Sequence, residues 1–451
     1  MIRVMIAAPA SNSGKTVVTC ALLRALRARG LDPCAFKCGP DYIDPMFHCA
    51  VLGVESHNLD LFFTEEARLR ALFAAWCAGH GAAVCEGAMG FYDGLGGTTD
   101  RASAYHVSKT LDLPVILVLR ARGAGLSLAA QIRGLRDFRP DSHIAGVILN
   151  ECSPMLCRTL APALERETGV AVLGCLPPME AAQIPARHLG LLTAGEITDL
   201  EQRLSVLAQA LEENVDLPRL LALCERTQEQ PAGEDPEPPR VRIAVAQDEA
   251  FCFTYAETLE TLRRCGAEIV PFSPLRDETL PGGVSALYLP GGYPELHARQ
   301  LSENEPMRRA VAAAVRGGMP TVAECGGFLY LGRALQDPAG ESFPMAGVLD
   351  GVGENTGKLV RFGYGTLRVQ EDSLLFRAGE DIPAHEFHHW DSTDCGAALT
   401  MEKPVSHRAW RCGFTSPTLY AGFPHLYFAG KPELAARLVA AAENYQTLRG
   451  I

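Results

Sequence analysis

The stretch that most constrains this chain runs from an apolar segment, Val4–Ala8, into the turn Ser13-Gly14-Lys15-Thr16. Apolar residues then recur at helical spacing, so the sequence predicts a strand, a tight turn and a helix in succession. Backbone N–H groups at such a turn bind phosphate, the lysine bridges the β- and γ-phosphates, and the next hydroxyl binds Mg²⁺. We therefore interpret the turn as an ATP site.

Composition excludes several classes of protein. The chain of 451 residues is long enough for two or three domains, and its net charge of −12 argues against a nucleic-acid-binding surface. Its 15 cysteines include no C-x-x-C pair, which favours a reducing cytoplasm over a disulfide framework or a zinc ribbon. Because no apolar run reaches about 18 residues, we expect no membrane span and no signal peptide.

One segment of unusual composition divides the chain. Residues 227–239 carry four prolines and four acidic residues, which cannot bury apolar surface. We therefore expect a domain over 1–226, a linker over 227–239 and a second domain over 240–451. Before the linker, short apolar runs alternate with helical patterns, which predicts an α/β fold with a parallel sheet. Ligands in such sheets bind beyond the carboxyl ends of the strands.

Two acidic loops of the first half lie where that edge is expected. Asp41 and Asp44 follow one predicted strand in a Pro/Gly-rich stretch. Glu86 ends a buried strand, 82–86, and Asp93 follows in a glycine-rich loop. An acid at a strand end beside a phosphate-binding turn is suited to hold Mg²⁺ or to orient water, although solvated acids in a turn remain the simpler alternative.

The second half contains a pattern typical of a nucleophile. Strand residues 320–324 lead into Cys325, Gly326 and Gly327, and then into a helix. In such an elbow a sharp turn presents the nucleophile, and the N–H of the next residue, here Gly326, donates to the oxyanion. The loop containing Gly292 suits the second oxyanion donor, and a distant histidine must supply the base.

Two histidine regions compete for the role of base. His425 precedes the terminal helix in A-G-F-P-H-L-Y-F, whereas His385 and His389 satisfy the zinc-protease pattern H-E-x-x-H. That motif needs a helix carrying both histidines on one face, and a nearby proline argues against a helix here. We therefore expect His425 to be the base and the zinc pattern to be accidental.

Taken together, these motifs resemble one family, the glutamine-dependent cobyrinate a,c-diamide synthases of corrinoid biosynthesis. The resemblance covers nearly the whole chain. Its motifs are, in order, IAAPASNSGKT, FKCGPDYIDPMFH, HNLD, EGAMGFYDG, GVILN, ARHLGLL, IAVAQDEAFCFTY, PFSPLRD, PGGYPELHA, AECGGFLYL, HEFHH and AGFPHLYF.

The resemblance implies an N-terminal synthetase domain, similar to dethiobiotin synthetase, followed by a class I glutaminase domain of the cobyric-acid-synthase type. Cys325 would attack the glutamine carboxamide and His425 would activate it. The carboxylate usually found two residues after this histidine is absent, because Tyr427 occupies the position. The resemblance therefore implies a Cys–His pair and leaves open which group orients His425.

In the first domain the resemblance implies that a substrate carboxylate attacks ATP to give an acyl phosphate, which ammonia then converts to an amide. Within its acidic positions we assign Asp41 and Glu86, with Thr16, to Mg²⁺, and Asp44 and Asp93 to catalysis by ordering substrate or intermediate. Asn150 is expected to contact adenine. The implied partners are cobyrinic acid, L-glutamine and ATP, and a homodimer is the family expectation.

Some residues depart from the family pattern. Pro9 replaces the first glycine of the phosphate-binding motif, as is usual in this family, whereas Asn12 stands where glycine is common and must tolerate a left-handed conformation. The oxyanion loop has two glycines where three are common, and His388-His389-Trp390 replaces a more usual His-Tyr-Ser. These differences concern specificity rather than reaction class.

Three alternatives remain open at this point. The same chemistry on hydrogenobyrinate or Ni-sirohydrochlorin is the closest, since each macrocycle carries acetate side chains. Cobyric acid synthase fits the G-P-D-Y-I-D-P stretch less well. A P-loop scaffold or partitioning ATPase with an inactive glutaminase-like tail belongs to a different class, and the retained Cys325 and His425 argue against it.

Overall fold

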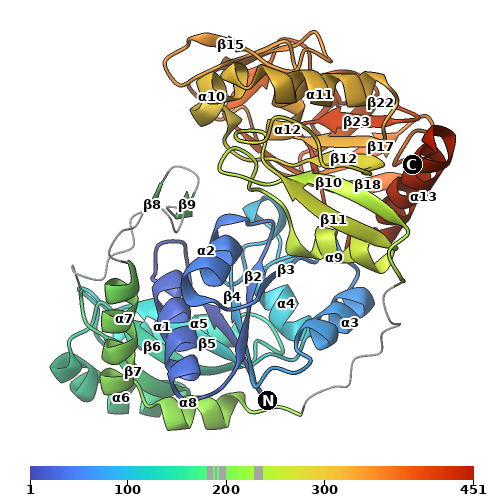
Figure 1. Cartoon of the computed structure of the whole chain (residues 1–451). Helices are drawn as coiled ribbons and strands as arrows, with labels where there is room; N and C mark the ends of the chain where they lie inside the picture. The colour runs from blue at the N-terminus through green and yellow to red at the C-terminus, as the bar shows by residue number, and fades with distance from the viewer. Residues whose placement is uncertain (180–185, 188–189, 192–199, 228–236, 451) are drawn as a thin grey trace. The chain divides into compact units, whose positions relative to one another are not determined.

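The computed structural model describes residues 1–179, 186–187, 190–191, 200–227 and 237–450, and it divides into two compact units (Figure 1). Unit 1 covers Met1–Gly233 and unit 2 covers Glu234–Ile451, so the division falls within the stretch predicted to be a linker. Most of that stretch, and residues 188–189 and 192 of the 186–192 motif, lie outside the described residues. No described helix has the length and apolar character to cross a membrane.

Unit 1 is built on a seven-stranded sheet in the order β3-β2-β4-β1-β5-β6-β7, and all its neighbouring strands pair in parallel. The α/β class predicted from alternating apolar and helical patterns is confirmed. The strands are β1 (Ile2–Ala7), β2 (Pro33–Cys38), β3 (Ser56–Leu59), β4 (Ala82–Glu86), β5 (Val115–Arg120), β6 (Ile144–Asn150) and β7 (Ala171–Leu176).

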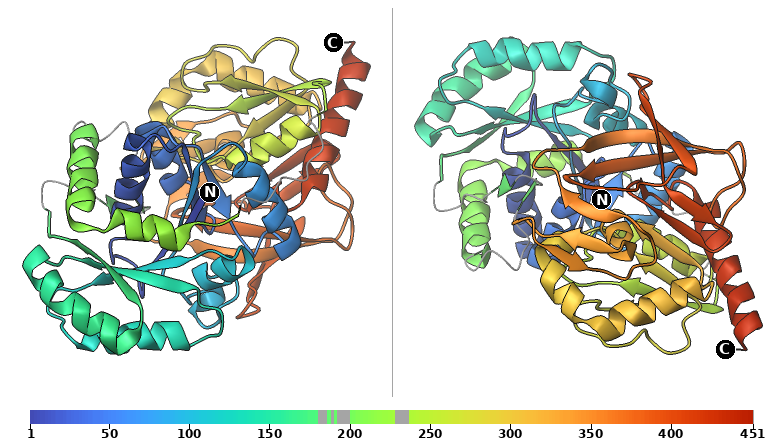
Figure 2. Two further views of the ribbon diagram at one scale, coloured as in Figure 1. Left: turned by 90° about the horizontal axis from the view of Figure 1, so that it is seen from below. Right: turned by 90° about the horizontal axis from the view of Figure 1, so that it is seen from above.

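Helices cover both faces of this sheet, which explains why its strands are apolar throughout. One core joins the sheet to α1 (Lys15–Ala28), α2 (Ile43–Leu52), α7 (Leu200–Asn214) and α8 (Leu217–Cys224). The other core lies beneath α3 (Glu66–Trp76), α4 (Ala104–Thr110), α5 (Ser127–Asp137) and α6 (Pro154–Thr168). In the left view of Figure 2, α5 and α6 lie on one side of the sheet, with α7 and α8 on the other. The short elements are η1 (Leu95–Gly97) and the hairpin β8 (Ala186–Arg187) and β9 (Gly190–Leu191).

The register of the sheet brings the first site together. Ile6 at the end of β1 pairs with Glu86 at the end of β4, and Glu86 pairs on its other side with Lys37 of β2. The phosphate-binding turn follows β1 directly. Three parallel strands therefore end beside this turn, at the edge where ligands of α/β sheets bind.

Unit 2 contains a second, six-stranded sheet in the order β11-β10-β12-β13-β23-β22, parallel except for the edge strand β22. Its strands are β10 (Val241–Ala246), β11 (Ala267–Phe272), β12 (Ala286–Leu289), β13 (Thr321–Glu324), β22 (Phe414–Ser416) and β23 (Leu419–Gly422). Its helical elements are α9 (Ala256–Arg264), η4 (Pro294–His297), α10 (Ala298–Glu303), α11 (Glu305–Arg316), α12 (Gly326–Leu331) and α13 (Pro432–Arg449).

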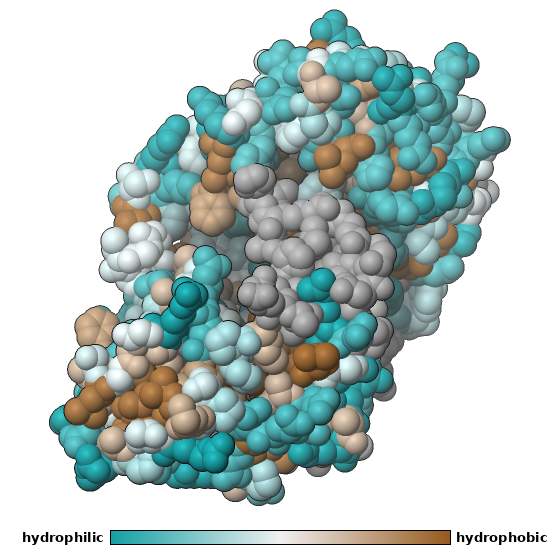
Figure 3. Space-filling view, turned by 90° about the vertical axis from the view of Figure 1, so that its left-hand side faces the viewer, coloured by the Kyte–Doolittle hydropathy of each residue, from teal (hydrophilic) through white to brown (hydrophobic). Residues whose placement is uncertain are grey.

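Two further sheets of unit 2 were not predicted from the sequence. A five-stranded antiparallel sheet joins β21 (Ala409–Cys412), β20 (Leu399–Glu402), β17 (Arg361–Val369), β18 (Asp381–His388) and β24 (His425–Leu426). A four-stranded sheet joins β15 (Ser342–Pro344), β14 (Ala334–Gln336), β16 (Val352–Asn355) and β19 (Trp390–Ser392). On the face shown in Figure 3, hydrophilic side chains predominate and apolar ones form separate groups.

Candidate functional site

The turn after β1 has the backbone that a phosphate cradle requires. Gly14 caps α1 with φ 97°, a left-handed conformation that side chains rarely adopt. Asn12 also has φ 60°, which agrees with the tolerance predicted for asparagine there. From the end of β6, Asn150 Nδ2 donates to the Ser13 carbonyl at 2.9 Å, and a Cβ on Gly14 would overlap this amide. Asn150 therefore supports the turn, and its predicted contact with adenine stays a prediction.

Lys15 is buried and directed back into the loops around it. Its Nζ donates to the carbonyls of Ala10 at 3.1 Å and Met89 at 2.6 Å, and Ser13 Oγ also donates to Ala10. Burial, together with the nearby Lys37 ammonium, lowers the pKa of Lys15 to about 8. The Met89 contact places the loop after β4 directly beside the phosphate-binding turn.

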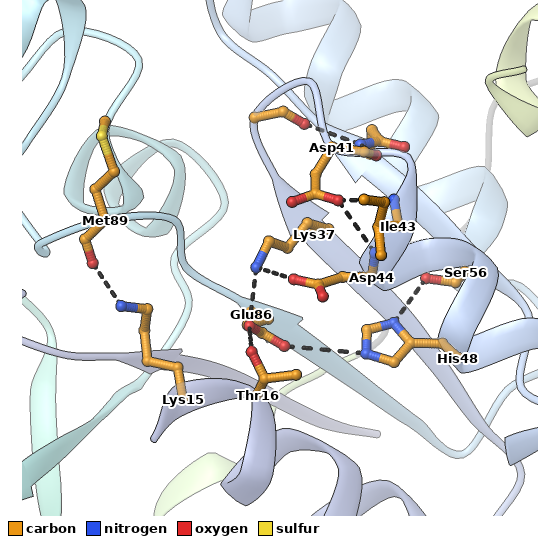
Figure 4. Close-up of polar contacts among 12 residues, drawn as sticks. Lys15, Thr16, Lys37, Asp41, Ile43, Asp44, His48, Ser56, Glu86 and Met89 are labelled. Carbon is orange, nitrogen blue, oxygen red and sulfur yellow. Dashed lines mark hydrogen bonds and ion pairs between the residues drawn. The ribbon is translucent and has the colours of Figure 1, made fainter. Parts of the chain in front are cut away.

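Glu86 is the centre of the polar cluster at this edge (Figure 4). Its Oε1 accepts hydrogen bonds from Thr16 Oγ1 at 2.6 Å and from Lys37 Nζ at 2.8 Å. Its Oε2 has no hydrogen-bond partner among the described residues and lies 3.9 Å from His48 Nε2. Burial raises the pKa of Glu86, while the Lys37 ammonium opposes that rise. Thr16 and Glu86, two of the predicted Mg²⁺ ligands, are thus in contact.

Lys37 joins the two acidic stretches predicted from the sequence. It forms ion pairs with Asp44 and with Glu86, and all three side chains are buried. Burial opposes the charge on Lys37, but Asp44 and Glu86 raise its pKa well above its ordinary value. Burial likewise opposes the charge on Asp44, but Lys37 lowers its pKa. Lys37 therefore stays charged, and it neutralises part of the carboxylate cluster.

The expectation that both acids of the Pro/Gly-rich stretch lie in a loop is wrong for Asp44. Asp44 belongs to the first turn of α2, because Asp41 Oδ1 accepts hydrogen bonds from the N–H groups of Ile43 and Asp44 and so starts the helix. Burial and the Asp44 charge raise the pKa of Asp41 to about 6. Asn58 anchors the stretch by donating to the Gly39 and Asp41 carbonyls at 2.9 and 2.7 Å. Asp41 remains a predicted Mg²⁺ ligand, with one oxygen engaged in capping.

Asp93 has a different environment from the buried acids. It is exposed, and its Oδ2 accepts the Gly90 N–H at 2.9 Å. The same loop is joined to the phosphate-binding turn by a hydrogen bond of 2.8 Å from Phe91 N to the Ala8 carbonyl. Asp93 therefore shapes a loop at the rim of the site, where its predicted contact with substrate stays a prediction.

Sequence reasoning did not assign roles to Lys37 and His48. A signal for Lys37 exists, since a lysine inside a buried strand needs a charged partner. His48 lies on α2, is fully buried, and shares a 3.0 Å hydrogen bond between Nδ1 and Ser56 Oγ. Burial lowers the pKa of His48 to about 4, so it faces Glu86 as a neutral imidazole. No sequence spacing indicates that contact.

In unit 2 the predicted nucleophile elbow is present. Cys325 follows β13 directly, caps α12 and has φ 48° and ψ −101°, a conformation that L-residues rarely adopt. A Cβ on Gly327 would overlap the Leu289 carbonyl, so only glycine permits the close packing of α12 against β12. The Cys325 side chain is 8% exposed, and this turn presents it at the edge of the sheet.

His425 lies on the short strand β24, which pairs with β18, and it contacts Cys325. Burial opposes the charge on His425, but the neighbouring Cys325 and Glu324 raise its pKa to about 10. A Cβ on Gly291 would lie 2.5 Å from His425 Cε1, so the glycine-rich loop lies against the imidazole. The structure therefore brings the thiol and the imidazole together, and their catalytic roles stay a prediction.

The two predicted oxyanion donors are neighbours. A Cβ on Gly326 would lie 3.1 Å from the Gly292 nitrogen and 2.9 Å from Pro294 Cδ. The glycine-rich loop after β12 thus packs against the residue that follows Cys325. This proximity is the arrangement that an oxyanion hole built from the two N–H groups requires, and the role itself stays a prediction.

Glu324, next to the nucleophile, is a residue that sequence reasoning missed. It is fully buried, and its Oε2 lies 3.7 Å from His425 Nδ1. That oxygen accepts the Tyr288 hydroxyl at 3.1 Å, while Oε1 accepts the Leu426 N–H at 3.1 Å. A carboxylate ending the otherwise apolar strand T-V-A-E is the signal that indicates a buried partner.

The H-E-x-x-H pattern does not form a zinc-protease helix. His385 and Glu386 lie on strand β18, where successive side chains point to opposite faces, and His389, the second histidine of the pattern, lies in the bend between β18 and β19. His388 Nδ1 is 2.6 Å from the Trp390 carbonyl, and its ring stacks on Phe423. Two histidines one helical turn apart are therefore not available, as the nearby proline indicated.

Comparison with known proteins matches a family model to most of each unit. The model of the CobQ/CobB/MinD/ParA nucleotide binding domain matches residues 4–192, which include the phosphate-binding turn and Glu86. The model of the CobB/CobQ-like glutamine amidotransferase domain matches residues 242–432, which include Cys325 and His425. The fold class expected for each half is confirmed.

Relatives named cobyrinate a,c-diamide synthase match over nearly the whole chain. The one from Listeria monocytogenes serotype 4b is 40% identical, covering 98% of this chain and 100% of its own. The one from Gloeobacter violaceus is 41% identical over 97% and 96%, and the one from Salmonella typhimurium is 38% identical over 98% of both chains. The order of motifs, the two sites and this full-length similarity agree, and the chain belongs to the cobyrinate a,c-diamide synthase family.

Proposed function

We propose that this chain uses ATP and glutamine to convert the a and c acetate carboxylates of cobyrinic acid into primary amides. The observation that carries the proposal is that each unit of the chain brings together a cluster of polar and reactive side chains. One is a phosphate-binding turn with a buried carboxylate cluster, and the other is a thiol–imidazole pair at a nucleophile elbow. The names of the full-length relatives support this substrate.

In unit 1 a substrate carboxylate attacks the γ-phosphorus of ATP, which gives an acyl phosphate and ADP. This step is needed because hydroxide is a poor leaving group and phosphate is a good one. Lys15 neutralises charge on the phosphates, and the N–H groups of the turn around Gly14 hold them. Ammonia then attacks the acyl carbon, phosphate departs, and the primary amide remains.

The donor set at the edge of unit 1 fits Mg²⁺. The Thr16 hydroxyl and the Glu86 carboxylate are hard oxygen ligands in contact, and Glu86 Oε2 is buried without a hydrogen bond among the described residues. Mg²⁺ in phosphoryl-transfer sites uses one or two carboxylates and completes its shell with phosphates and water. Held by Thr16 and Glu86, with Asp41 as the further predicted ligand, it would neutralise the transferring phosphoryl group.

In unit 2 the Cys325 thiolate attacks the carboxamide carbon of glutamine. The oxyanion accepts hydrogen bonds from the N–H groups of Gly292 and Gly326, and His425 gives its proton to the departing ammonia. Water activated by His425 then hydrolyses the glutamyl thioester to glutamate. One turnover of this site supplies one ammonia, so two turnovers accompany the two amidations.

Two point variants test whether unit 1 and unit 2 carry out separate steps of the reaction. Cys325→Ala is expected to lose glutamine-dependent amidation but to keep amidation driven by added ammonium chloride. Lys15→Ala is expected to lose both, because without the acyl phosphate ammonia has no electrophile. If ammonium chloride rescues neither variant, or rescues both, the assignment of the two steps is wrong.

The macrocycle is tested by offering cobyrinic acid, hydrogenobyrinic acid and Ni-sirohydrochlorin separately and weighing the products by mass spectrometry. Double amidation of cobyrinic acid at the lowest KM supports the proposal. A preference for either of the other two macrocycles would mean that this macrocycle, and not cobyrinic acid, is the substrate. ATP hydrolysis without amidation of any macrocycle would instead favour the scaffold ATPase.

The cellular setting stays a prediction. The 15 cysteines are scattered along the chain without a C-x-x-C pair, which supports the expected reducing cytoplasm, and the family resemblance supports a homodimer. Light scattering of the purified chain, with and without ATP, measures the oligomeric state. A monomeric mass at micromolar concentration would contradict the homodimer.

A further inference from the structure

The glutaminase pair lacks the carboxylate that usually orients its histidine. Tyr427 occupies that position, and its ring packs edge-on against Tyr255 with 5.1 Å between the ring centroids. A neutral phenol in place of a carboxylate brings no negative charge to balance an imidazolium. A Cys–His pair still needs a group that fixes the ring orientation and stabilises its charged form, because an imidazole free to rotate is a poor proton shuttle.

We propose that Glu324 is the positioning residue of His425, supplied from the residue before the nucleophile instead of from beyond the histidine. This inference rests on the proposed glutaminase function of Cys325 and His425. The Glu324 carboxylate lies 3.7 Å from His425 Nδ1, the nitrogen that a positioning carboxylate must face if Nε2 serves the thiol.

Glu324 is itself held rigidly by groups on both sides. Tyr288 on β12 donates its hydroxyl to Oε2, and the Leu426 N–H donates to Oε1. The second bond matters most, because Leu426 directly follows His425 in the chain. One carboxylate therefore fixes both the backbone that carries the imidazole and the position of the imidazole itself.

Burial strengthens this interaction. Glu324 and His425 are 0% and 2% exposed, so water does not screen their attraction. A buried carboxylate without a cation would be costly, and the imidazolium provides that cation. Other ionisable groups near His425 are Cys325 and, on β18, His385, Glu386 and His388. His385 is neutral, since burial and the His425 charge lower its pKa to about 3.

The elbow explains how consecutive residues serve the same imidazole. Glu324 is the last residue of β13 and keeps its strand conformation, whereas Cys325 turns to φ 48°. In a continued strand the two side chains would point to opposite faces. The turn at Cys325 instead allows the thiol and the carboxylate both to reach His425.

The test compares Glu324→Gln and Glu324→Asp with the wild-type full-length chain. Gln keeps the shape but removes the charge, so we expect the glutaminase kcat to fall by about 10³- to 10⁴-fold, as when other positioning carboxylates are removed. The KM for glutamine should change less than about threefold, because Glu324 acts through His425. Asp keeps the charge but is shorter, so the kcat of Glu324→Asp should lie between those of the wild type and Glu324→Gln.

Two readouts separate positioning from a structural role. Amidation driven by ammonium chloride should stay within about twofold of wild type, because unit 1 does not use Glu324. The rate at which iodoacetamide alkylates Cys325 at pH 7 should fall with kcat, since the thiolate depends on a charged His425. Glu257→Gln, which changes another buried carboxylate of unit 2, is the matched control and should keep its glutaminase activity.

The outcomes are distinguishable. If Glu324→Gln keeps wild-type kcat and the wild-type alkylation rate, the positioning role is wrong while the proposed function stands. If the wild-type chain itself hydrolyses no glutamine, the proposed function has failed instead. Should Glu324→Gln not fold, Glu324→Asp decides: a lowered kcat with unchanged KM supports the role, and an unchanged kcat overturns it.

Discussion

Thr16 donates its hydroxyl hydrogen to Glu86 across 2.6 Å, joining the start of α1 to the end of β4. The two residues lie 70 positions apart in the sequence, so the contact depends on the parallel pairing of β1 with β4. It also leaves the second carboxylate oxygen of Glu86 without a hydrogen bond among the described residues. A hydroxyl and a carboxylate held together in this way supply two ligands for the proposed Mg²⁺ site.

The first prediction concerns this hydroxyl. Thr16→Val keeps the shape of the side chain but removes the oxygen, so we expect the Mg²⁺ concentration needed for half-maximal ATP hydrolysis to rise about 10- to 100-fold. Thr16→Ser retains the hydroxyl and is the matched control, with a change below about threefold. Magnesium titrations of ATP hydrolysis measure both. An unchanged requirement in Thr16→Val would remove Thr16 from the Mg²⁺ site.

The second prediction concerns the phosphate-binding turn. Gly14→Ala forces a side chain into φ 97° and against the Asn150 amide, so we expect ATP affinity to fall at least about tenfold. Asn150→Ala removes one hydrogen bond to Ser13 and should cost about 1 kcal/mol, or about fivefold in Kd. Gly134→Ala on α5, where a Cβ meets open space, is the control. Calorimetric titration with ATP measures all three, and equal affinity for Gly14→Ala and Gly134→Ala would contradict the prediction.

The third prediction concerns the buried cation of unit 1. Lys37→Met leaves Asp44 and Glu86 buried without their partner, which should lower the free energy of unfolding by about 3–5 kcal/mol. Lys109→Met removes an exposed lysine 3.7 Å from Asp141 and should cost less than about 1 kcal/mol. Denaturant unfolding of the full-length chain at neutral pH measures the difference. Equal stabilities for the two variants would show that Lys37 does not compensate the carboxylates.

The fourth prediction concerns pH. The pKa of His425 is about 10 in the folded chain against an ordinary value of 6.5, so the imidazole stays charged through neutral pH. Its contribution to stability is complete below about pH 6.5 and is lost as the pH rises through about 10. The NMR signals of the His425 imidazole should therefore not titrate between about pH 5 and 8, whereas an ordinary histidine titrates near pH 6.5. A titration midpoint near 6.5 for His425 would contradict the raised pKa.

Much of unit 1 could be predicted because its signals are local. The turn at Gly14 and the strand ending in Glu86 are recognisable from apolar runs and motif spacing alone. Asp44 was placed in a loop because Pro40 and Pro45 dominate the pattern around it. The structure starts a helix there, since the Asp41 carboxylate satisfies the N–H groups that open it.

The residues that sequence reasoning missed act through contacts distant along the chain. Lys37 reaches Glu86 because β2 and β4 are neighbours, and Glu324 reaches His425 because β24 returns beside the elbow. Motif spacing carries no information about such pairings. The only local signal is a charged residue in an apolar strand, which shows that a partner exists without identifying it.

The conformation of Cys325 has a thermodynamic consequence for unit 2. An L-residue held at φ 48° and ψ −101° is strained by about 1–3 kcal/mol, and glycine alone would relieve that strain. The hydrogen bond from Cys325 N to the Gly422 carbonyl at 2.8 Å, and the packing of α12, keep the strained turn in place. Glycine at position 325 would thus give a more stable turn than alanine would, but the variant would lack the thiol. Unit 2 therefore loses stability by holding Cys325 in this conformation.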